Sequence, residues 1–314
     1  MQTVRTPDDR FAELEGFDHE PHYVDVPTDD GVGETLRMAW VEAGPADGDI
    51  VLLLHGEPSW SFLYRSMLGP LADAGLRAIA PDLVGFGRSD KPTRIEDHTY
   101  ARHVGWVQAF VEALDLREIT LVGQDWGGLI GLRLAAEQPH RFARIVAANT
   151  GLPTGDHPMP DIWHRFRVAV QTAPELDVAR FVASGCVRGL DAAARTGYDA
   201  PFPDETFKAG PRAMPGLVPY EPDNPASDAN RAAWRTLAAS STPMLLAFSD
   251  SDPITGAMAP ILERAMTGAH GQPHRTIADA GHFLQEDAGG ELAEAIIGFV
   301  AAARGAESAS EPTG

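Results

Sequence analysis

Cysteine, long apolar runs and a basic amino-terminal segment are nearly or wholly missing from this chain, and each absence excludes a class of protein. Cys186 is the only cysteine, so no disulfide can form within the chain, and we expect a reducing, cytoplasmic location. No apolar run reaches the roughly 18 residues that suggest a membrane-spanning helix. The first residues show no basic segment followed by an apolar one, as a secretory signal would. We therefore expect no signal peptide and no membrane partner.

Positive charge is also scarce. The 314-residue chain has 25 Lys and Arg against 45 Asp and Glu, a formal net charge of −20, and its only lysines are Lys91 and Lys208. Such a surface repels nucleic acid, so we expect no nucleic-acid partner. An acidic chain poor in lysine is typical of salt-loving microbes, and a GC-rich genome that favours arginine is the alternative. Stability in low salt separates the two, because unscreened carboxylates repel one another.

The apolar residues follow two alternating patterns. Short continuous runs typical of buried strands alternate with segments that have the spacing of amphipathic helices, such as 100–114 and 292–302. The predicted strands cover 36–43, 50–54, 76–80, 119–122, 145–149, 243–248 and 275–277. Strands that alternate with helices predict an α/β fold, with a mostly parallel central sheet flanked by helices.

One long segment interrupts this alternation. Between about 151 and 240 the chain has helical stretches and many prolines, and no convincing strand pattern. The last residues are small and polar, which is typical of disorder. We therefore predict three parts, which are a core (1–150 and 241–304), an inserted helical cap (151–240) and a disordered tail (305–314).

The motif Gly123-Gln124-Asp125-Trp126-Gly127-Gly128 lies between a predicted strand and a predicted helix. In this Gly-x-Asp-x-Gly pattern the glycines permit a sharp turn in which neighbouring Cβ atoms would clash. It is the nucleophile elbow of the α/β-hydrolase fold, with aspartate where serine is usual. The start of the helix favours a carboxylate, and Asp125 is a nucleophile that needs no base to activate it. The alternative is that Asp125 only caps the helix.

Hydrolases of this fold carry their catalytic residues in the chain order nucleophile, acid, histidine. Asp252 and His282 each follow a predicted strand, and open α/β sheets place their active sites at these carboxyl ends. We therefore predict His282 as the base, in preference to His55. We predict Asp252 as its acid partner, in preference to Asp250, which we expect in a turn.

The segment His55-Gly56-Glu57-Pro58 ends another predicted strand and should face the elbow. Its backbone N–H at Glu57 is one predicted oxyanion donor. The N–H of Trp126, directly after the nucleophile, is the second.

Three segments together resemble a known family. They are the stretch from His55 to Arg65, the elbow, and Asn149-Thr150-Gly151-Leu152-Pro153. The chain resembles the haloalkane dehalogenases of subfamily I over about residues 23–301. The resemblance implies that two indole N–H groups bind the halide. Trp126 matches the first by position, and Trp163 matches the second better than Trp234 does. It also implies that the Glu57 side chain helps to organise the water and halide region.

The function implied by the resemblance is hydrolysis of a haloalkane to a primary alcohol, halide and a proton. Asp125 would displace the halide and form an alkyl ester, which a water activated by His282 would hydrolyse while Asp252 orients the imidazole. We expect no metal and no organic cofactor. The expected partners are a small halogenated alkane and the halide ion, and the expected assembly is a monomer or small homo-oligomer.

Two alternatives use the same residues differently. An epoxide hydrolase shares the Asp125 nucleophile but needs acidic O–H donors, normally two cap tyrosines, and the predicted cap holds Tyr198 and Tyr220. A catalytically inactive hydrolase fold that binds a ligand or a partner is the second alternative. Retention of ligand-dependent stabilisation in an inactive Asp125→Asn variant would distinguish turnover from binding.

Overall fold

The computed structural model describes residues 1–28 and 33–310, and an eight-stranded sheet with the order β10-β9-β8-β7-β4-β5-β3-β2 forms its centre. The strands are β2 (His22–Pro27), β3 (Thr35–Ala43), β4 (Asp49–Leu54), β5 (Leu76–Pro81), β7 (Ile119–Gln124), β8 (Phe142–Ala148), β9 (Met244–Ser249) and β10 (Arg275–Ile277). The strands β10, β9, β8, β7, β4 and β5 each pair in parallel with the next strand in this order. β3 pairs antiparallel with β5 and with β2. A separate antiparallel pair joins β1 (Thr3–Val4) to β6 (Lys91–Pro92). The predicted mostly parallel α/β sheet is confirmed.

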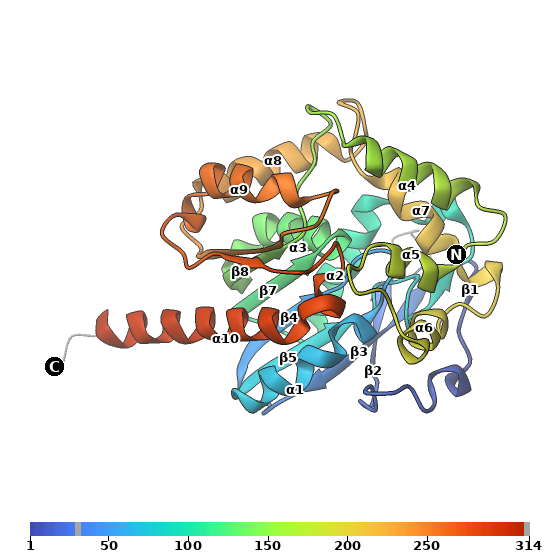
Figure 1. The fold of residues 1–314 in the computed structure, drawn as a ribbon, viewed down its shortest axis with the longest axis horizontal. Helices are drawn as coiled ribbons and strands as arrows, with labels where there is room; N and C mark the ends of the chain where they lie inside the picture. The colour runs from blue at the N-terminus through green and yellow to red at the C-terminus, as the bar shows by residue number, and fades with distance from the viewer. Residues whose placement is uncertain (29–32, 311–314) are drawn as a thin grey trace.

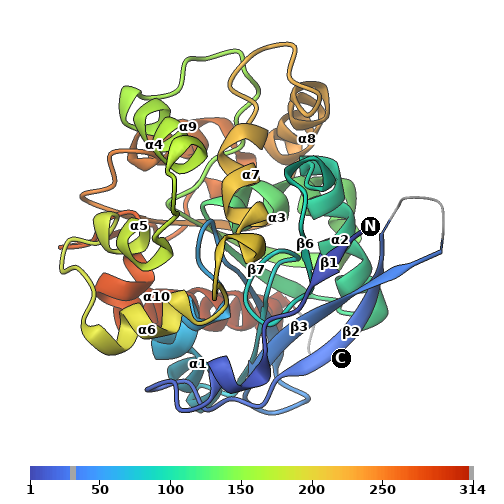
Figure 2. The ribbon, with the colours of Figure 1, turned by 90° about the vertical axis from the view of Figure 1, so that its right-hand side faces the viewer.

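Helices cover both faces of this sheet (Figures 1 and 2). α1 (Arg65–Asp73) and α10 (Leu284–Ser310) pack together on one face, and α2 (Tyr100–Ala113) packs with α3 (Trp126–Glu137) on the other. This cover explains the apolar runs, because every residue of β7 and β9 is buried. α9 (Ala259–Ala265) lies against β9. Short 3-10 helices lie at Asp8–Phe11, Ser61–Tyr64, Ile95–Asp97, Pro139–Arg141, Glu205–Phe207, Gly256–Met258 and Thr267–Ala269.

The segment between β8 and β9 is helical. It contains α4 (Asp161–Thr172), α5 (Val178–Ser184), α6 (Ala192–Asp199), α7 (Ala209–Leu217) and α8 (Ser227–Ala239), and no strand lies in this fully described stretch. Figure 2 shows α4 to α7 grouped on one side of the molecule, away from β2 and β3. α8 packs against α3 of the core. We call residues 151–240 the cap segment, and its boundaries stay a prediction.

The last helix is longer than the helical spacing at 292–302 suggests. α10 begins at Leu284, has a non-helical residue at Ala288, and continues to Ser310. It therefore extends into the tail 305–314 for which we predicted disorder, and residues 311–314 lie outside the described residues. Alanine, frequent in this part of the chain, has the highest helix propensity and favours such an extension. Among the described residues, no helix is both long and apolar enough to cross a membrane.

Candidate active site

The turn between β7 and α3 has the strained geometry that the glycines predicted. Asp125 adopts φ 49° and ψ −124°, a conformation rare for a residue with a side chain. A Cβ on Gly123 would lie 2.6 Å from the Gly128 Cα, and one on Gly127 would lie 1.8 Å from the Leu54 carbonyl oxygen. The close approach of strand to helix therefore requires glycine at these positions, and it projects Asp125 at the carboxyl edge of the sheet.

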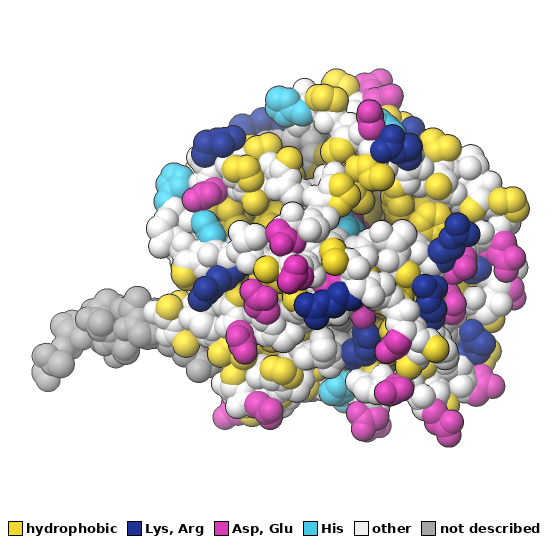
Figure 3. All heavy atoms as spheres, in the orientation of Figure 1, with side chains coloured by type: hydrophobic (Ala, Val, Ile, Leu, Met, Phe, Trp, Pro, Cys, Tyr) yellow, Lys and Arg dark blue, Asp and Glu magenta, His cyan; other side chains and the backbone are white. Residues whose placement is uncertain are grey.

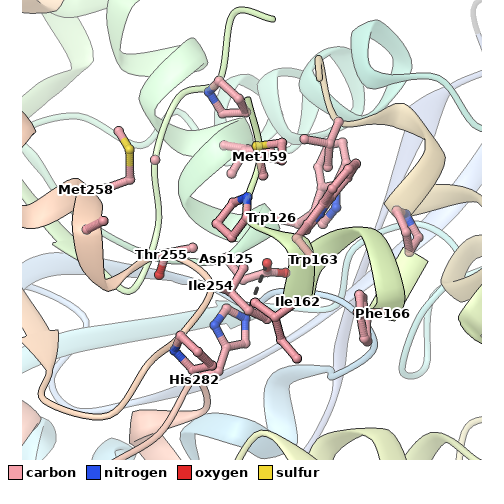
Figure 4. A pocket seen from close by; sticks show the side chains of 18 of the residues that line it. Asp125, Trp126, Met159, Ile162, Trp163, Phe166, Ile254, Thr255, Met258 and His282 are labelled. Atoms are coloured by element: carbon pink, nitrogen blue, oxygen red, sulfur yellow. Dashed lines mark ion pairs between the residues drawn. The ribbon is translucent and has the colours of Figure 1, made fainter. Parts of the chain in front are cut away.

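The structure brings together the three residues predicted as the catalytic set. His282 Nε2 lies 3.4 Å from Asp125 Oδ2, the contact drawn as a dashed line in Figure 4, and His282 Nδ1 lies 3.1 Å from Asp252 Oδ2. Asp252 Oδ1 accepts a hydrogen bond from the Ile254 N–H at 2.9 Å, and Oδ2 accepts from the Thr255 N–H at 3.2 Å and from its hydroxyl. The imidazole is thus held between two carboxylates.

The charges of these groups depend on one another. Burial disfavours the charged imidazole, but the Asp252 charge and the hydrogen bonds to Asp125 and Asp252 outweigh it and raise the pKa of His282 to about 10. Burial also works against the charged form of Asp252, but His282 and the hydrogen bonds from Thr255 and Ile254 lower its pKa to about 2. With Asp125 unmodified, these contacts therefore favour the protonated imidazolium form of His282.

The two residues that competed for these roles lie elsewhere. Asp250 accepts hydrogen bonds from the backbone N–H groups of Asp279 and Ala280, at 3.0 and 3.3 Å, so it organises a turn. His55 is fully buried, and its Nε2 accepts from the Leu83 N–H at 2.9 Å while Nδ1 faces the Gly56 carbonyl at 3.0 Å. Both ring nitrogens of His55 are therefore occupied by the backbone.

Glu57 contacts Asp125 through its backbone N–H, and its side chain lies near enough to be influenced by the Asp125 charge. The Glu57 N–H donates to Asp125 Oδ1 at 2.9 Å, as an oxyanion donor would. The second predicted donor, the N–H of Trp126, makes no hydrogen bond to this carboxylate within the described chain. Burial and repulsion from Asp125 raise the pKa of Glu57 well above its usual value, and Oε1 is buried without a partner among the described residues. Burial and the neighbouring Asp125 charge therefore both favour the protonated form of the Glu57 carboxyl.

A cavity of about 970 Å³ separates these residues from the cap segment. Figure 3 shows the surface hollowed between α9 and α4, with hydrophobic side chains around the hollow. Asp125, Trp126 and Trp163 all line the cavity and lie close together in Figure 4. Neither indole N–H has a hydrogen-bond partner within the described parts of the chain, so both are available to a ligand. The other cap tryptophan, Trp234, also lines the cavity.

Trp163 is buried in α4 and is held by its neighbours' rings. Its ring centroid lies 5.3 Å from that of Tyr220, and the Arg167 guanidinium lies 4.7 Å from the Tyr220 ring and 5.6 Å from the Trp163 ring. Tyr220 and Tyr198 do not line the cavity, and the Tyr198 hydroxyl donates to Glu286 instead. The two O–H donors that an epoxide hydrolase needs are therefore not in place.

Sequence reasoning missed the residues that hold the His282 loop. Asn149, at φ 38° after β8, donates from Nδ2 to the carbonyls of Gly281 and His282 at 2.8 and 3.1 Å. Gln124 Nε2 donates to the same His282 carbonyl at 3.0 Å. Both residues lie at strand ends within segments that carry the family resemblance, but nothing in the sequence indicates that their side chains bond to the His282 loop. The described residues contain no cluster of His, Cys, Asp and Glu that could hold a metal ion.

Comparison with known proteins covers nearly the whole chain. The model of the α/β hydrolase fold family matches residues 49–289. Haloalkane dehalogenases of Psychrobacter cryohalolentis and Mycobacterium marinum are 51% and 52% identical over 300 and 299 residues, covering 96% and 95% of this chain and 98% and 100% of theirs. The tetrameric structure of haloalkane dehalogenase DpaA from Paraglaciecola agarilytica is similar at a TM-score of 0.86 and 36% identity, covering 94% of this chain and 97% of that one. Haloalkane dehalogenase DbeA from Bradyrhizobium elkani is similar at a TM-score of 0.78 and 26% identity, and the match covers 93% of this chain and 100% of that one.

Proposed function

Because the chain belongs to the haloalkane dehalogenases, a family of hydrolases with the α/β-hydrolase fold, we propose that it converts haloalkanes to a primary alcohol, halide and a proton through a covalent ester on Asp125. One observation carries the proposal. A carboxylate in a nucleophile elbow, 3.4 Å from a histidine, faces an apolar cavity that two free indole N–H groups also line. A carboxylate nucleophile and neutral halide donors suit displacement at a saturated carbon.

In the first half-reaction an oxygen of Asp125 attacks the carbon that carries the halogen. The new carbon–oxygen bond forms as the carbon–halogen bond breaks, and the electron pair of that bond leaves with the halide. Negative charge grows at the leaving atom, where the Trp126 and Trp163 N–H groups would stabilise it in a cavity of low polarity. Because the indoles are neutral, they bind the halide without holding it as tightly as a cation would.

In the second half-reaction His282 takes a proton from water, and the oxygen of that water attacks the ester carbonyl of Asp125. Esterification removes the Asp125 charge and its hydrogen bond, both of which raise the pKa of His282. After esterification, and before water is deprotonated, the imidazolium therefore loses the proton that it carried in the free enzyme. This proton is the proton product, and its loss leaves a neutral ring that can act as a base. Asp252 stabilises the imidazolium that forms as water is deprotonated, and the Glu57 and Trp126 N–H groups hold the oxyanion. As the tetrahedral intermediate collapses, the bond between the carbonyl carbon and the alkyl oxygen breaks, and the departing alkoxide takes the second proton of the attacking water. The alcohol leaves, Asp125 is again a carboxylate and His282 is again an imidazolium.

The proposal is tested by following bromide and oxygen separately. Wild-type enzyme should release bromide and alcohol from 1-bromobutane and 1,3-dibromopropane in high-salt buffer, and Asp125→Asn should not. A single turnover in ¹⁸O-water should place the label in the Asp125 carboxyl group and leave the alcohol unlabelled, because the alcohol takes its oxygen from Asp125. Label in the alcohol after one turnover would contradict the covalent ester.

The epoxide alternative is tested in parallel with styrene oxide. We expect no diol, because none of the tyrosines among the described residues lines the cavity. Diol without bromide release would overturn the proposed function and direct attention to Tyr198 and Tyr220. If folded protein released no bromide and formed no diol, the result would instead favour the alternative of a catalytically inactive fold that binds a ligand or a partner.

The assembly and location remain part of the proposal. The similar DpaA was solved as a tetramer, and we expect a monomer or small homo-oligomer here. Light scattering during size-exclusion chromatography measures this directly. The cytoplasmic location and the absence of a nucleic-acid partner stay predictions.

A further inference from the structure

A buried carboxylate outside the catalytic set joins the His282 loop to the cap segment. Asp287 lies in the first turn of α10 and is 3% exposed. Its Oδ2 accepts hydrogen bonds from the backbone N–H groups of Gly281 and Val187, and its Oδ1 accepts from that of Arg188, all at 2.9 Å. Its hydrogen-bond donors in the described chain are backbone N–H groups, and none of the described lysines or arginines forms an ion pair with it. Three backbone N–H groups, from two segments about 100 residues apart, therefore solvate this carboxylate.

The two segments joined by Asp287 are in direct backbone contact. The Phe283 N–H donates to the Gly185 carbonyl at 3.3 Å. A Cβ on Gly281 would lie 2.4 Å from the same carbonyl oxygen, and a Cβ on Gly185 would lie 2.7 Å from the Phe283 ring. The end of α5 is thus seated on the residues either side of His282, and no side chain separates them.

We propose that Asp287 is a positioning residue that fixes His282 for hydrolysis of the ester, by holding its loop against residues 185–188 of the cap segment. This inference rests on the proposed function. Asp125 is held independently, since its N–H donates to the Asn149 carbonyl at 3.0 Å and its Oδ1 accepts from Glu57. The first half-reaction uses Asp125 and not the imidazole, so a change at Asp287 should spare it.

The second half-reaction depends on the loop more than the first does. The His282 ring contacts Asp125 and Asp252, and esterification removes the charged partner Asp125. The ring is then oriented by Asp252 and by the backbone of its own loop. Asn149 and Gln124 hold the carbonyl of His282, whereas Asp287 holds the N–H of the preceding residue, Gly281. A shift of about 1 Å in a reacting group can lower a rate about 100-fold, so losing one anchor should have a measurable effect.

The test compares Asp287→Asn with a matched control, Glu286→Gln. Asparagine keeps the shape of the side chain but has one acceptor oxygen, so it cannot accept from all three N–H groups as the carboxylate does. Glu286 is the adjacent carboxylate on α10. It pairs with Arg65 and accepts from the Tyr198 hydroxyl, and its side chain makes no contact with Gly281. Both variants remove one buried negative charge from the same helix turn.

Rapid mixing with 1-bromobutane, followed by acid quench, separates the two half-reactions. Bromide formed in the burst reports ester formation, and intact-mass measurement of the alkyl adduct reports its loss. For Asp287→Asn we expect an unchanged burst and adduct loss slowed about tenfold or more. In the steady state kcat and KM should then fall together while kcat/KM stays the same, because kcat/KM reports the steps up to ester formation. Glu286→Gln should keep both rate constants.

A merely structural role would give a different result. It would lower the melting temperature or the active fraction without changing the ratio of the two rate constants, and that outcome overturns the inference. Asp287→Glu, which keeps the charge but displaces the carboxylate, should also slow adduct loss, and it carries the test if Asp287→Asn does not fold. A wild-type enzyme that forms no adduct would overturn the proposed function and this inference with it. A normal wild type with unaffected variants overturns this inference alone.

Discussion

The two walls of the cavity are held in different ways. On the core wall, Asp125, Asp252 and His282 lie at the ends of strands, and backbone hydrogen bonds hold each loop in place. On the cap wall, Trp163 is held by ring packing, and the loop before α4 is tied to α8 by Arg231 and Asp156, whose side chains are 26% and 44% exposed. Exposed ion pairs of this kind contribute little to stability. The contacts described for the core wall are thus buried hydrogen bonds, whereas those described for the cap wall are ring packing and a partly exposed ion pair.

The largest effect should come from the base on the core wall. His282→Gln should lower steady-state bromide release by about 1,000-fold or more, because the ester forms but is not hydrolysed. One equivalent of bromide should appear per active site, and the peptide that contains Asp125 should gain the mass of the alkyl group. Wild-type enzyme under the same quench is the control. Bromide release beyond one equivalent at an undiminished rate would show that another residue activates water.

The acid partner should come next. Asp252→Asn removes the charge that raises the pKa of His282 and stabilises the imidazolium, and we expect kcat to fall about 100-fold. Asp250→Asn is the matched control, since Asp250 accepts from Asp279 and Ala280 in a turn, and its kcat should change less than about threefold. Measurement of kcat for both variants at pH 8 decides between them. Equal losses would contradict the assignment of Asp252 as the partner.

On the cap wall, Trp163→Phe removes the N–H and leaves a ring to pack against Tyr220. Loss of one donor to the departing halide should lower kcat/KM for 1-bromobutane about 100-fold. Trp234→Phe makes the same chemical change at the other cap tryptophan that lines the cavity, and it should cost about threefold or less. The reverse order of effects would place the second halide donor at Trp234.

The smallest effect concerns how stability varies with pH on the core side. The folded pKa of His282, about 10, lies above its ordinary 6.5, so its contribution is complete below pH 6.5 and is lost as the pH rises through about 10. Burial lowers the pKa of Lys91 to about 7 from 10.5, so the unfolded chain binds the proton more strongly and stability rises with pH between those values. The two contributions therefore oppose each other above pH 7.

Urea unfolding of the wild type, His282→Gln and Lys91→Met at pH 6, 7.5 and 9 measures both contributions. Relative to the wild type, the free energy of unfolding of His282→Gln should rise more steeply with pH, and that of Lys91→Met should fall more steeply. Each slope should change by at most about 1.4 kcal/mol per pH unit. Parallel curves for all three proteins would show that neither proton is linked to folding.

Some parts of the site could be predicted because their signals are local. The glycines of the elbow are required by contacts within one strand–turn–helix unit, such as the 2.6 Å approach of a Gly123 Cβ to Gly128. Asp252 follows β9, and its carboxylate bonds to Ile254 and Thr255 just beyond it. The continuous apolar runs correctly identified the buried strands β4, β7 and β9. The edge strand β2 was not predicted, because most of its residues are not buried and so leave no apolar run.

Other parts had no local signal. The hydrogen bonds from Gln124 and Asn149 to His282 join residues more than 130 positions apart. Asp287 lies near the start of a helix, and nothing in its neighbourhood along the chain indicates that Val187 and Arg188 donate to it. The raised pKa of Glu57 comes from its burial and from the nearby Asp125 charge, and the sequence reveals neither. Each of these properties arises from segments that meet only in the folded chain.

The sequence by itself indicated the α/β sheet, the strained elbow and the three residues Asp125, Asp252 and His282 that the fold brings together. These follow from side-chain size, apolar spacing and the chemistry of residues within a few positions of one another. The tertiary structure alone decided which groups surround them, and with what charge. Hydrogen bonding and burial act between neighbours in space, so the pKa of His282, the free indole N–H groups and the three bonds to Asp287 exist only once the core and the cap segment have come together.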